Sequence, residues 1–361
     1  MNLPSVPTLV RGPVSASLGG NSTHGPHVTF PMGDPSRVGE ARRFAADLAT
    51  RLAFDAIQSG RLAVVVNELG NNLLRHAVGG RLLIGARTIN DSVAIELISM
   101  DQGPGIADIQ ACMRDGYSTA GSAGQGLGAM QRMADDFDIH SQAGDGTLVL
   151  ARFYRERDRS GAARRLPGFA VGAICLAAPG ERVSGDGWSV NIDASTIEVM
   201  VADGLGHGPD AAVAADAALA AFHRPRPRGA GRFVELAHNA LRGTRGAAIA
   251  IAQADAATGR VSFSGAGNVV GRILSGVTDR TLLAQNGTAG VQLRSNVQEQ
   301  DMEWPAHALL LLCSDGVQSR WQLEDRSLLQ RDPALVAAFV IWKFCRGRDD
   351  ATVVVIRRAE T

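Results

Sequence analysis

A polar segment near the middle of the chain, at residues 155–167, limits the folds that are possible. It contains five arginines among Glu, Asp, Gly and Pro and shows no apolar period. Apolar residues recur regularly on both sides of it, so we interpret the segment as a solvated linker between two domains. A chain of 361 residues also has about the length expected for two domains.

Composition excludes several classes of function. Apolar residues make up 45% and charged residues 20%, as in ordinary globular domains. The 36 basic and 36 acidic residues cancel, so we expect neither nucleic acid nor a membrane surface as a partner. Lys343 is the one lysine, which excludes a P-loop nucleotide site. The four cysteines form no CxxC pair, which predicts no zinc site or disulfide framework and favours a cytoplasmic location.

The ends of the two domains follow from local composition. Residues 1–29 are rich in Pro, Gly, Ser and Thr and lack the pattern of a signal peptide, so we expect a flexible arm. No stretch reaches the roughly 18 to 20 apolar residues that span a bilayer. We therefore expect one domain at 30–154 and a second at 168–361.

Apolar periodicity predicts different layouts for the two parts. In the first part it predicts an α/β unit of helices at 36–59, 61–77 and up to about 136, with strands at 81–89, 92–100, 137–141 and 147–153. In the second it predicts a layered sandwich with helices at 209–222, 231–242 and 333–344, and strands at 169–177, 188–192, 197–201, 247–254, 260–266, 269–274, 308–313 and 352–357.

Three polar residues share one face of the second predicted helix. Glu68, Asn72 and His76 are four residues apart, so each is rotated by only about 40° from the last. A carboxylate, a carboxamide and an imidazole there suit a general base, a magnesium ligand and a phosphate-side contact. Taken alone, the pattern is also that of a solvated helix face.

A second group of residues follows the predicted hairpin. Asp101 ends a strand, where its carboxylate can accept a hydrogen bond from the amino group of adenine. Gly103 and Gly105 permit close approach of the backbone. A glycine-rich segment then leads to a helix N-terminus, which favours phosphate. Further candidates for nucleotide binding are Gly124, Gly126, Gly128 and Thr147.

In this order, the boxes Asn67–Asn72, Asp101–Gly105 and Gly116–Thr119 resemble the GHKL (Bergerat) ATPase family, most closely its anti-sigma and RsbT-like switch-kinase branch. The resemblance covers about residues 30–154 and implies a Bergerat α/β sandwich that binds ATP and Mg²⁺. It implies that Glu68 activates the acceptor hydroxyl, Asn72 holds magnesium and Asp101 reads adenine. The implied acceptor is a Ser or Thr of a STAS-domain protein.

Four aspartates recur at strand ends or turns of the second part: Asp186, Asp203, Asp315 and Asp349. Any single Asp-Gly is most simply a turn. Carboxylates that converge at the ends of neighbouring strands, however, are hard oxygen ligands for two divalent ions. Such ions lower the pKa of a bridging water for attack on phosphorus.

This pattern resembles the metal-dependent (PPM-type) Ser/Thr protein phosphatases, specifically the SpoIIE and RsbX branch, over about residues 168–358. The resemblance implies an α-β-β-α sandwich and two Mn²⁺ or Mg²⁺ ions. Asp203 would bridge both ions, the Gly204 carbonyl would support one, and the other three aspartates would complete the set. Asp350 is an alternative to Asp349.

Two departures from the phosphatase pattern concern substrate binding. Gly185 stands where eukaryotic relatives carry a carboxylate, and no phosphate-binding arginine lies near that motif. Arg242 and Arg245 are candidates to replace it, although each alone also fits a surface arginine.

The sequence thus predicts a fused switch kinase and phosphatase that act on STAS-domain proteins of a bacterial partner-switching or stressosome pathway. In an alternative, the first domain holds nucleotide only to bind a STAS protein or a sigma factor, and the phosphatase is the sole catalyst. A third interpretation, in which both domains are scaffold, is disfavoured by the intact boxes.

Overall fold

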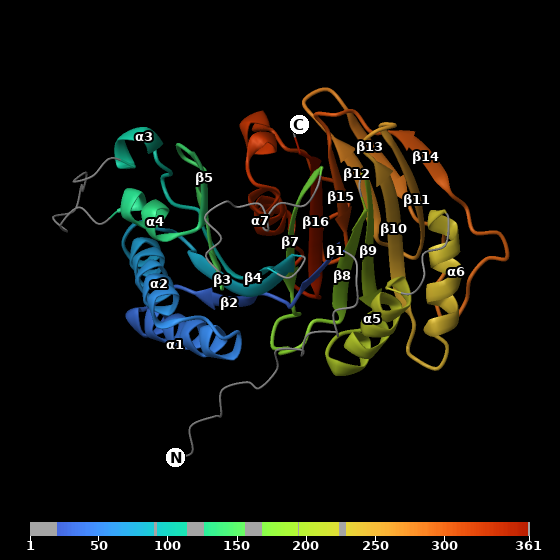
Figure 1. Cartoon of the computed structure of the whole chain (residues 1–361), viewed down its shortest axis with the longest axis horizontal. Helices are drawn as coiled ribbons and strands as arrows, with labels where there is room; N and C mark the ends of the chain where they lie inside the picture. The colour runs from blue at the N-terminus through green and yellow to red at the C-terminus, as the bar shows by residue number, and fades with distance from the viewer. Residues whose placement is uncertain are drawn as a thin grey trace, which may run out of the picture.

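The protein is a stack of helix and sheet layers, seen edge-on in Figure 1. The structure is a computed structural model that describes residues 20–89, 92–113, 126–155, 168–193, 195–223 and 229–359. Most of the proposed linker lies outside these ranges. Among the described helices, none has both the length and the apolar character needed to cross a membrane.

Two helices form the outer layer of the N-terminal part, α1 (Pro35–Arg51) and α2 (Ala56–His76). We expected the break between them near residue 60, and that expectation is wrong. Asp55 caps the second helix by accepting a hydrogen bond from Gln58 N at 2.7 Å, and Ala53 has a positive φ of 58°. The chain therefore turns at residues 52–55.

An antiparallel sheet packs beneath these helices. Its strands are β2 (Val28–Pro31), β3 (Arg81–Ile89), β4 (Ser92–Asp101), β6 (Gly146–Tyr154) and β5 (Asp136–Gln142). Short helices α3 (Ile109–Cys112) and α4 (Leu127–Met133) connect β4 to β5. Because strand residues alternate between faces, Ile95 and Leu97 pack toward the helices while Ile98 and Met100 face the opposite side.

The C-terminal part is the expected sandwich of two sheets. One contains β8 (Asp186–Asp193), β9 (Thr196–Gly204), β10 (Ala247–Asp255), β11 (Arg260–Ala266) and β14 (Gln300–Glu303), covered by α5 (Pro209–Phe222) and α6 (Ala230–Ala240). The other contains β7 (Phe169–Leu176), β16 (Ala351–Arg358), β15 (Leu309–Cys313), β12 (Val270–Leu274) and β13 (Asp279–Leu283). Trp188, Phe263 and Trp304 fill the core between the sheets.

Helix α7 (Pro333–Phe344) lies between the two parts. It is apolar on all sides, and every residue from Pro333 to Ile341 is buried. One side packs on β7 and β16, and the other packs on β4 and β6 of the N-terminal sheet. These elements form one hydrophobic cluster, in which Met100 and Leu150 meet Ala338 and Val355. The two domains therefore share a hydrophobic cluster instead of packing separately on either side of the linker.

A short strand in the expected arm also joins the two parts. β1 (Gly20–His24) pairs with β3 on one side and with β8 on the other, so one continuous sheet runs through both. The boundary of the arm at residue 29 is thus wrong for residues 20–29, which contain β1 and the start of β2. Unpaired edges of β3 and β8 gain a hydrogen-bonding partner by this arrangement.

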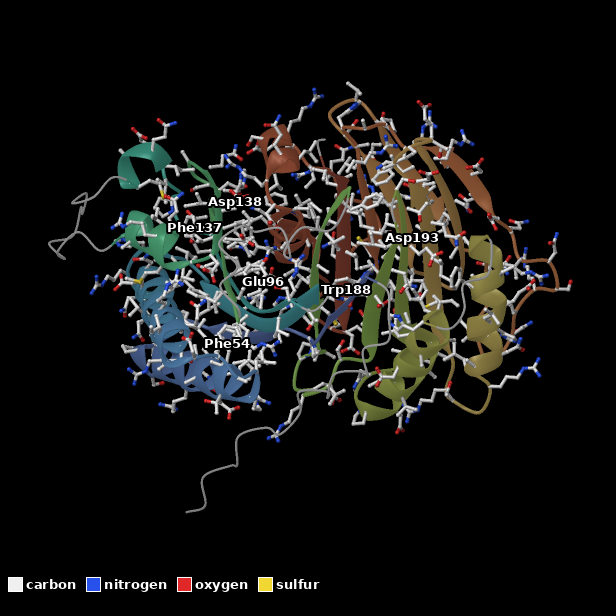
Figure 2. The ribbon with its side chains drawn as sticks, in the orientation of Figure 1. Phe54, Glu96, Phe137, Asp138, Trp188 and Asp193 are labelled. Atoms are coloured by element: carbon white, nitrogen blue, oxygen red, sulfur yellow. The ribbon has the colours of Figure 1, made fainter. Side chains whose placement is uncertain are left out.

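Buried charges fix the start of α7 against the N-terminal sheet. Arg152 on β6 donates two hydrogen bonds to Asp332, at 2.6 and 2.8 Å, and a third to Glu96 on β4 at 2.5 Å. Asp332 also caps α7, since its carboxylate accepts a hydrogen bond from Ala334 N. Asp138 on β5 in turn accepts from Asp332 N at 2.7 Å. Figure 2 labels Glu96 and Asp138 on the sheet that faces α7.

We predict that Arg152→Ala destabilises the whole chain. The change leaves the buried carboxylate of Glu96 and the partly buried carboxylate of Asp332 without their main partner, which costs about 3–5 kcal/mol. Urea unfolding followed by circular dichroism and by tryptophan fluorescence should show one transition shifted by that amount. The control Arg260→Ala removes the exposed pair with Asp301 and should cost about 1 kcal/mol or less. Equal losses in the two variants would contradict the prediction.

Candidate functional sites

The first candidate site lies where the end of α2 meets the end of β4. Glu68 and Asn72 are half-buried on α2, and His76 is exposed at its last position. Val78 O accepts a hydrogen bond from Gln102 N at 2.9 Å, which holds the two ends together. The structure thus brings the helix face and the Asp101 box to one place, as expected.

Asp101 is held in a defined position at this site. Its Oδ1 accepts a hydrogen bond from Gly103 N at 2.7 Å, while partial burial raises the pKa of the carboxyl group. Thr147 lies directly opposite on β6, so both side chains project from the same face of the sheet. This face is the one that α2 covers.

Three glycines are required by close packing around Asp101. A Cβ at Gly103 would lie 2.6 Å from His76 O, and one at Gly105 would overlap Gln142 O. A Cβ at Gly128 would overlap Met113 O. Gly126 precedes α4, and no side chain caps that helix. The remaining glycine candidate, Gly124, and the box at 116–119 lie outside the described residues.

Sequence reasoning missed Ser141 on β5. Its hydroxyl accepts a hydrogen bond from Ile106 N at 2.8 Å, donates to Gly146 O at 2.9 Å and lies 2.8 Å from Thr147 Oγ1. One side chain therefore ties the Asp101 box to the turn before Thr147. The residue carries no sequence signal of its own, since its role depends on the pairing of β5 with β6.

The second candidate site gathers the predicted aspartates at one edge of the sandwich. Asp186 and Asp203 are directly paired across β8 and β9. Asp315 follows β15, and the last pair, Asp349 and Asp350, precedes β16. The two sheets meet here, since the hydroxyl of Ser314 donates to Asp186 Oδ2 at 2.7 Å.

Electrostatics at this edge favour a bound cation. Burial, and then repulsion from Asp186 and the other aspartates, raises the pKa of Asp203. Burial likewise raises the pKa of Asp186 and of Asp315. Asp186 Oδ1 and Asp350 Oδ2 are buried and accept no hydrogen bond. Carboxylates that repel one another and lack donors fit divalent cations. Among the described residues, however, no group of three or more His, Cys, Asp or Glu side chains is arranged so that it could hold a metal ion.

Asp349 and Asp350 face different partners. Asp350 is buried and its Oδ1 accepts a hydrogen bond from Ala178 N at 2.8 Å, so this carboxylate fixes the loop before Asp186. Asp349 is half-buried and its charge contributes to the raised pKa of both Asp203 and Asp315. Asp350 also raises the pKa of Asp186 and of Asp203 and keeps one buried oxygen without a donor, so both aspartates stay candidate ligands.

Backbone packing explains two glycines of this site. Gly204 N donates to Gly185 O at 3.1 Å, and a Cβ at Gly204 would overlap Ala211 O. A Cβ at Gly185 would lie 2.6 Å from Asp350 Oδ2, which explains the absence of a carboxylate there. Asn268, which sequence reasoning missed, donates from Nδ2 to Asp315 Oδ2 at 2.6 Å.

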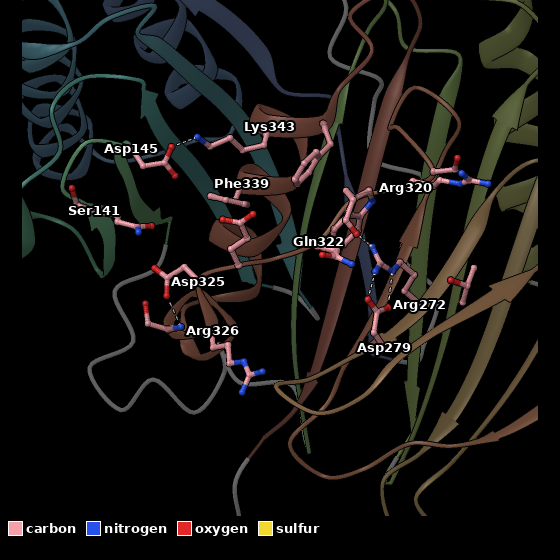
Figure 3. A pocket seen from close by; sticks show the side chains of 17 residues that line it. Ser141, Asp145, Arg272, Asp279, Arg320, Gln322, Asp325, Arg326, Phe339 and Lys343 are labelled. Atoms are coloured by element: carbon pink, nitrogen blue, oxygen red, sulfur yellow. Dashed lines mark hydrogen bonds and ion pairs between the residues drawn. The ribbon is translucent and has the colours of Figure 1, made fainter.

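A cavity of about 1390 Å³ lies between the two parts and borders the β5–β6 turn (Figure 3). Ser141 and Asp145 line one wall, and the segment around Trp321 lines another. Its charges balance, with four cations and four carboxylates: Arg272, Arg320, Arg326, Lys343, Asp145, Asp279, Glu324 and Asp325. The lining therefore selects no ligand by charge.

Comparison with known proteins assigns each part of the chain to a family. Residues 32–153 match the profile of the histidine kinase-like ATPase domain, and residues 193–359 match that of stage II sporulation protein E (SpoIIE). The serine/threonine-protein kinase RsbT of Bacillus subtilis (strain 168) is 35% identical over 111 residues, which are 31% of this chain and 84% of RsbT. The chain belongs to the RsbT family of histidine kinase-like ATPases. A SpoIIE domain follows its RsbT-like domain.

Two further relatives each match about one part of the chain. An anti-sigma F factor of Caldanaerobacter subterraneus subsp. tengcongensis is 30% identical over 125 residues, 33% of this chain and 86% of that protein. A structure of RsbX in complex with magnesium shares 18% identity with a TM-score of 0.47, over 53% of this chain and 96% of RsbX. By residue range, the ATPase match contains the Glu68 and Asp101 groups, and the SpoIIE match contains Asp203, Asp315 and Asp349.

We predict that Mn²⁺ stabilises the SpoIIE domain more strongly as the pH rises. The raised carboxyl pKa values mean that, above about pH 4, the native metal-free protein holds protons that the unfolded chain has released. Its free energy of unfolding therefore falls as the pH increases toward neutrality, and Mn²⁺ displaces those protons. Thermal unfolding with EDTA and with Mn²⁺ should show a larger shift at pH 7.5 than at pH 5.5. Equal shifts at both pH values would contradict the prediction.

Proposed function

We propose that the chain is a bifunctional regulator of partner switching. The RsbT-like domain transfers phosphate from ATP to a Ser or Thr of a STAS-domain protein, and the SpoIIE domain removes it. The observation that supports this proposal most directly is the presence of two separate polar sites in one chain, the first inside the ATPase match and the second, except for Asp186, inside the SpoIIE match. A cytoplasmic location and bacterial stressosome-type partners belong to the same proposal.

In the kinase half, α2 and the end of β4 carry residues with different roles. Asp101 accepts a hydrogen bond from the amino group of adenine, and Gly103 and Gly105 let the backbone beside it pack closely against His76 and Gln142. Asn72 would hold Mg²⁺, and Gly126 at the start of α4 would contact the phosphates. His76 and Thr147 lie beside Asp101 instead. ATP supplies the phosphoryl group when bound. Glu68, a half-buried carboxylate on α2, takes the proton from the acceptor hydroxyl as the general base.

In the phosphatase half, Asp203 would bridge two divalent ions, with Gly204 O, Asp186, Asp315 and Asp349 as further ligands. Mn²⁺ or Mg²⁺ when bound supplies a water of lowered pKa. The chain's own contribution is to hold these oxygens at one sheet edge, where Ser314 and Asn268 orient two of the carboxylates.

Arg245 is a better candidate than Arg242 for binding the substrate phosphate. Its guanidinium lies beside the Asp203 loop, since a Cβ at Gly206 would be 3.5 Å from Arg245 Nη1. Its pairing with Asp210, at 2.5 Å, is exposed to solvent and so is weak enough to be exchanged for a phosphate. Arg242 is exposed, and no contact places it at this loop.

A second function is favoured by the similarity to anti-sigma F factors. In this alternative the RsbT-like domain holds nucleotide only to bind a STAS protein or a sigma factor. The phosphatase is then the only catalyst. The two functions differ in whether Glu68 is needed for phosphate transfer.

We predict that Glu68→Ala abolishes phosphate transfer and largely spares ATP binding. A general base contributes to the transition state, so its removal affects the rate far more than ground-state affinity. Labelling of candidate STAS proteins with radioactive ATP, beside calorimetry of nucleotide binding, measures both. The control Glu40→Ala removes an exposed glutamate of α1 that pairs with Arg37. Equal labelling by wild type and Glu68→Ala would favour the binding alternative.

We predict that Asp203→Asn and Asp315→Asn each reduce Mn²⁺-stimulated hydrolysis of a phospho-STAS protein to background. An amide removes one negative charge from a site that binds cations through several carboxylates. The assay uses the full chain, because removing the RsbT-like domain would expose α7. The control Asp193→Asn changes an exposed aspartate at the other end of β8. Undiminished turnover, or turnover without metal, would overturn the assignment.

A further inference from the structure

The C-terminal end of α7 rests on the turn of the nucleotide site. Lys343 forms an ion pair with Asp145, and Trp342 packs against Gly146, where a Cβ would lie 3.0 Å from the ring. Gly146 directly precedes Thr147. A Cβ at Gly146 would overlap Asp101 O, so no side chain fits there. The last residues of α7 thus contact the segment that positions both Asp101 and Thr147.

The same end of α7 also holds the loop that carries Asp315. Phe344 O accepts a hydrogen bond from Gln318 N at 2.9 Å, and Gly316 O accepts one from Arg346 N at 2.7 Å. Val317 and Cys345 form an isolated antiparallel bridge between these hydrogen bonds.

The chain that leaves α7 then runs directly to the other candidate ligand. Only Cys345–Arg348 separate α7 from Asp349. At Gly316 the two segments touch, because a Cβ there would overlap Asp350 O. A shift at the end of α7 therefore moves the Asp315 loop and the Asp349 segment together.

The remainder of α7 prevents its end from moving independently. Asp332 is fixed by Arg152 at the start of the helix, and buried side chains cover both long sides. Interiors packed at such density transmit displacement instead of absorbing it. Only a concerted small shift, of the kind seen for packed helices, is compatible with these contacts.

We propose that α7 couples the two sites, so that nucleotide bound to the RsbT-like domain strengthens metal binding at the Asp203 cluster. The inference rests on the proposed function, because it requires both sites to bind their ligands. Nucleotide would hold Asp101 and the Asp145–Thr147 turn in place. The turn would then hold the end of α7 in the position that brings Asp315 and Asp349 to Asp203.

The test measures phosphatase activity of the full chain toward p-nitrophenyl phosphate, which needs neither kinase activity nor a protein partner. Free Mn²⁺ is titrated with and without saturating ADP, which carries adenine but has no γ-phosphoryl group to transfer. We expect ADP to lower the Mn²⁺ concentration for half-maximal activity about fivefold, the lower end of common coupling between sites. Asp101→Asn, at the ADP concentration that saturates wild type, should reduce that shift.

Two variants test the route through α7. The double variant Asp145→Asn, Lys343→Met removes both charges of the ion pair, and Trp342→Ala removes the contact with Gly146. Each should leave activity without ADP and calorimetric ADP affinity close to wild type, and each should reduce the Mn²⁺ shift below about twofold. Asp301→Asn, an exposed partner of Arg260 on β14, is the control and should keep the full shift.

The outcomes separate this proposal from the proposed function. Absence of Mn²⁺-dependent hydrolysis would overturn the phosphatase function itself. Hydrolysis that is unchanged by ADP, in protein shown by calorimetry to bind ADP, would overturn only the coupling. A shift that survives in both α7 variants would overturn the route through the helix. A lower Mn²⁺ requirement with ADP that both variants abolish supports the coupling, and a higher Mn²⁺ requirement with ADP would overturn it.

Discussion

The arrangement of the molecule depends on the burial of α7. A helix that is apolar on every side needs cover on every side, and the phosphatase sheet can provide only half of it. The remaining cover comes from the face of the RsbT-like sheet that carries Met100 and Leu150. The expected α-β-β-α sandwich and the expected α/β sandwich therefore share one layer. Folding of either part without the other would leave this face exposed to water.

Charge determines how the two parts meet along that helix. The apolar contacts alone would tolerate sliding of α7 over the sheet. The hydrogen bonds of Arg152 to Glu96 and Asp332 prevent such sliding, because their geometry is fixed. Asp138 adds a backbone contact at the same end. These buried groups contribute specificity of position more than net stability, because the free energy of desolvating them offsets much of their electrostatic attraction.

Local patterns predicted much of this structure from sequence, and pairings between distant segments account for what they missed. The bounds of α5 and α7 agree with the predicted ranges, because proline, a run of apolar residues and a polar stop mark each of them. β1 was missed because a Gly, Asn, Ser and Thr strand has no apolar alternation, and its partners β3 and β8 are distant in sequence. The packing of α7 against both parts was missed for a related reason, because an all-apolar sequence does not indicate which elements cover the helix.

The candidate sites show the same division at the level of single residues. Glu68, Asp101 and Asp203 could be found because a helix face or a strand end places them. Ser141 and Asn268 could not, because each acts through a hydrogen bond to a residue far away in the chain. The neighbours Asp349 and Asp350 were ambiguous in sequence, and they lie in the bend that precedes β16, where no strand alternation separates their side chains. Asp350 holds the loop at Ala178 and also adds charge to the carboxylate cluster, whereas Asp349 adds charge to that cluster alone.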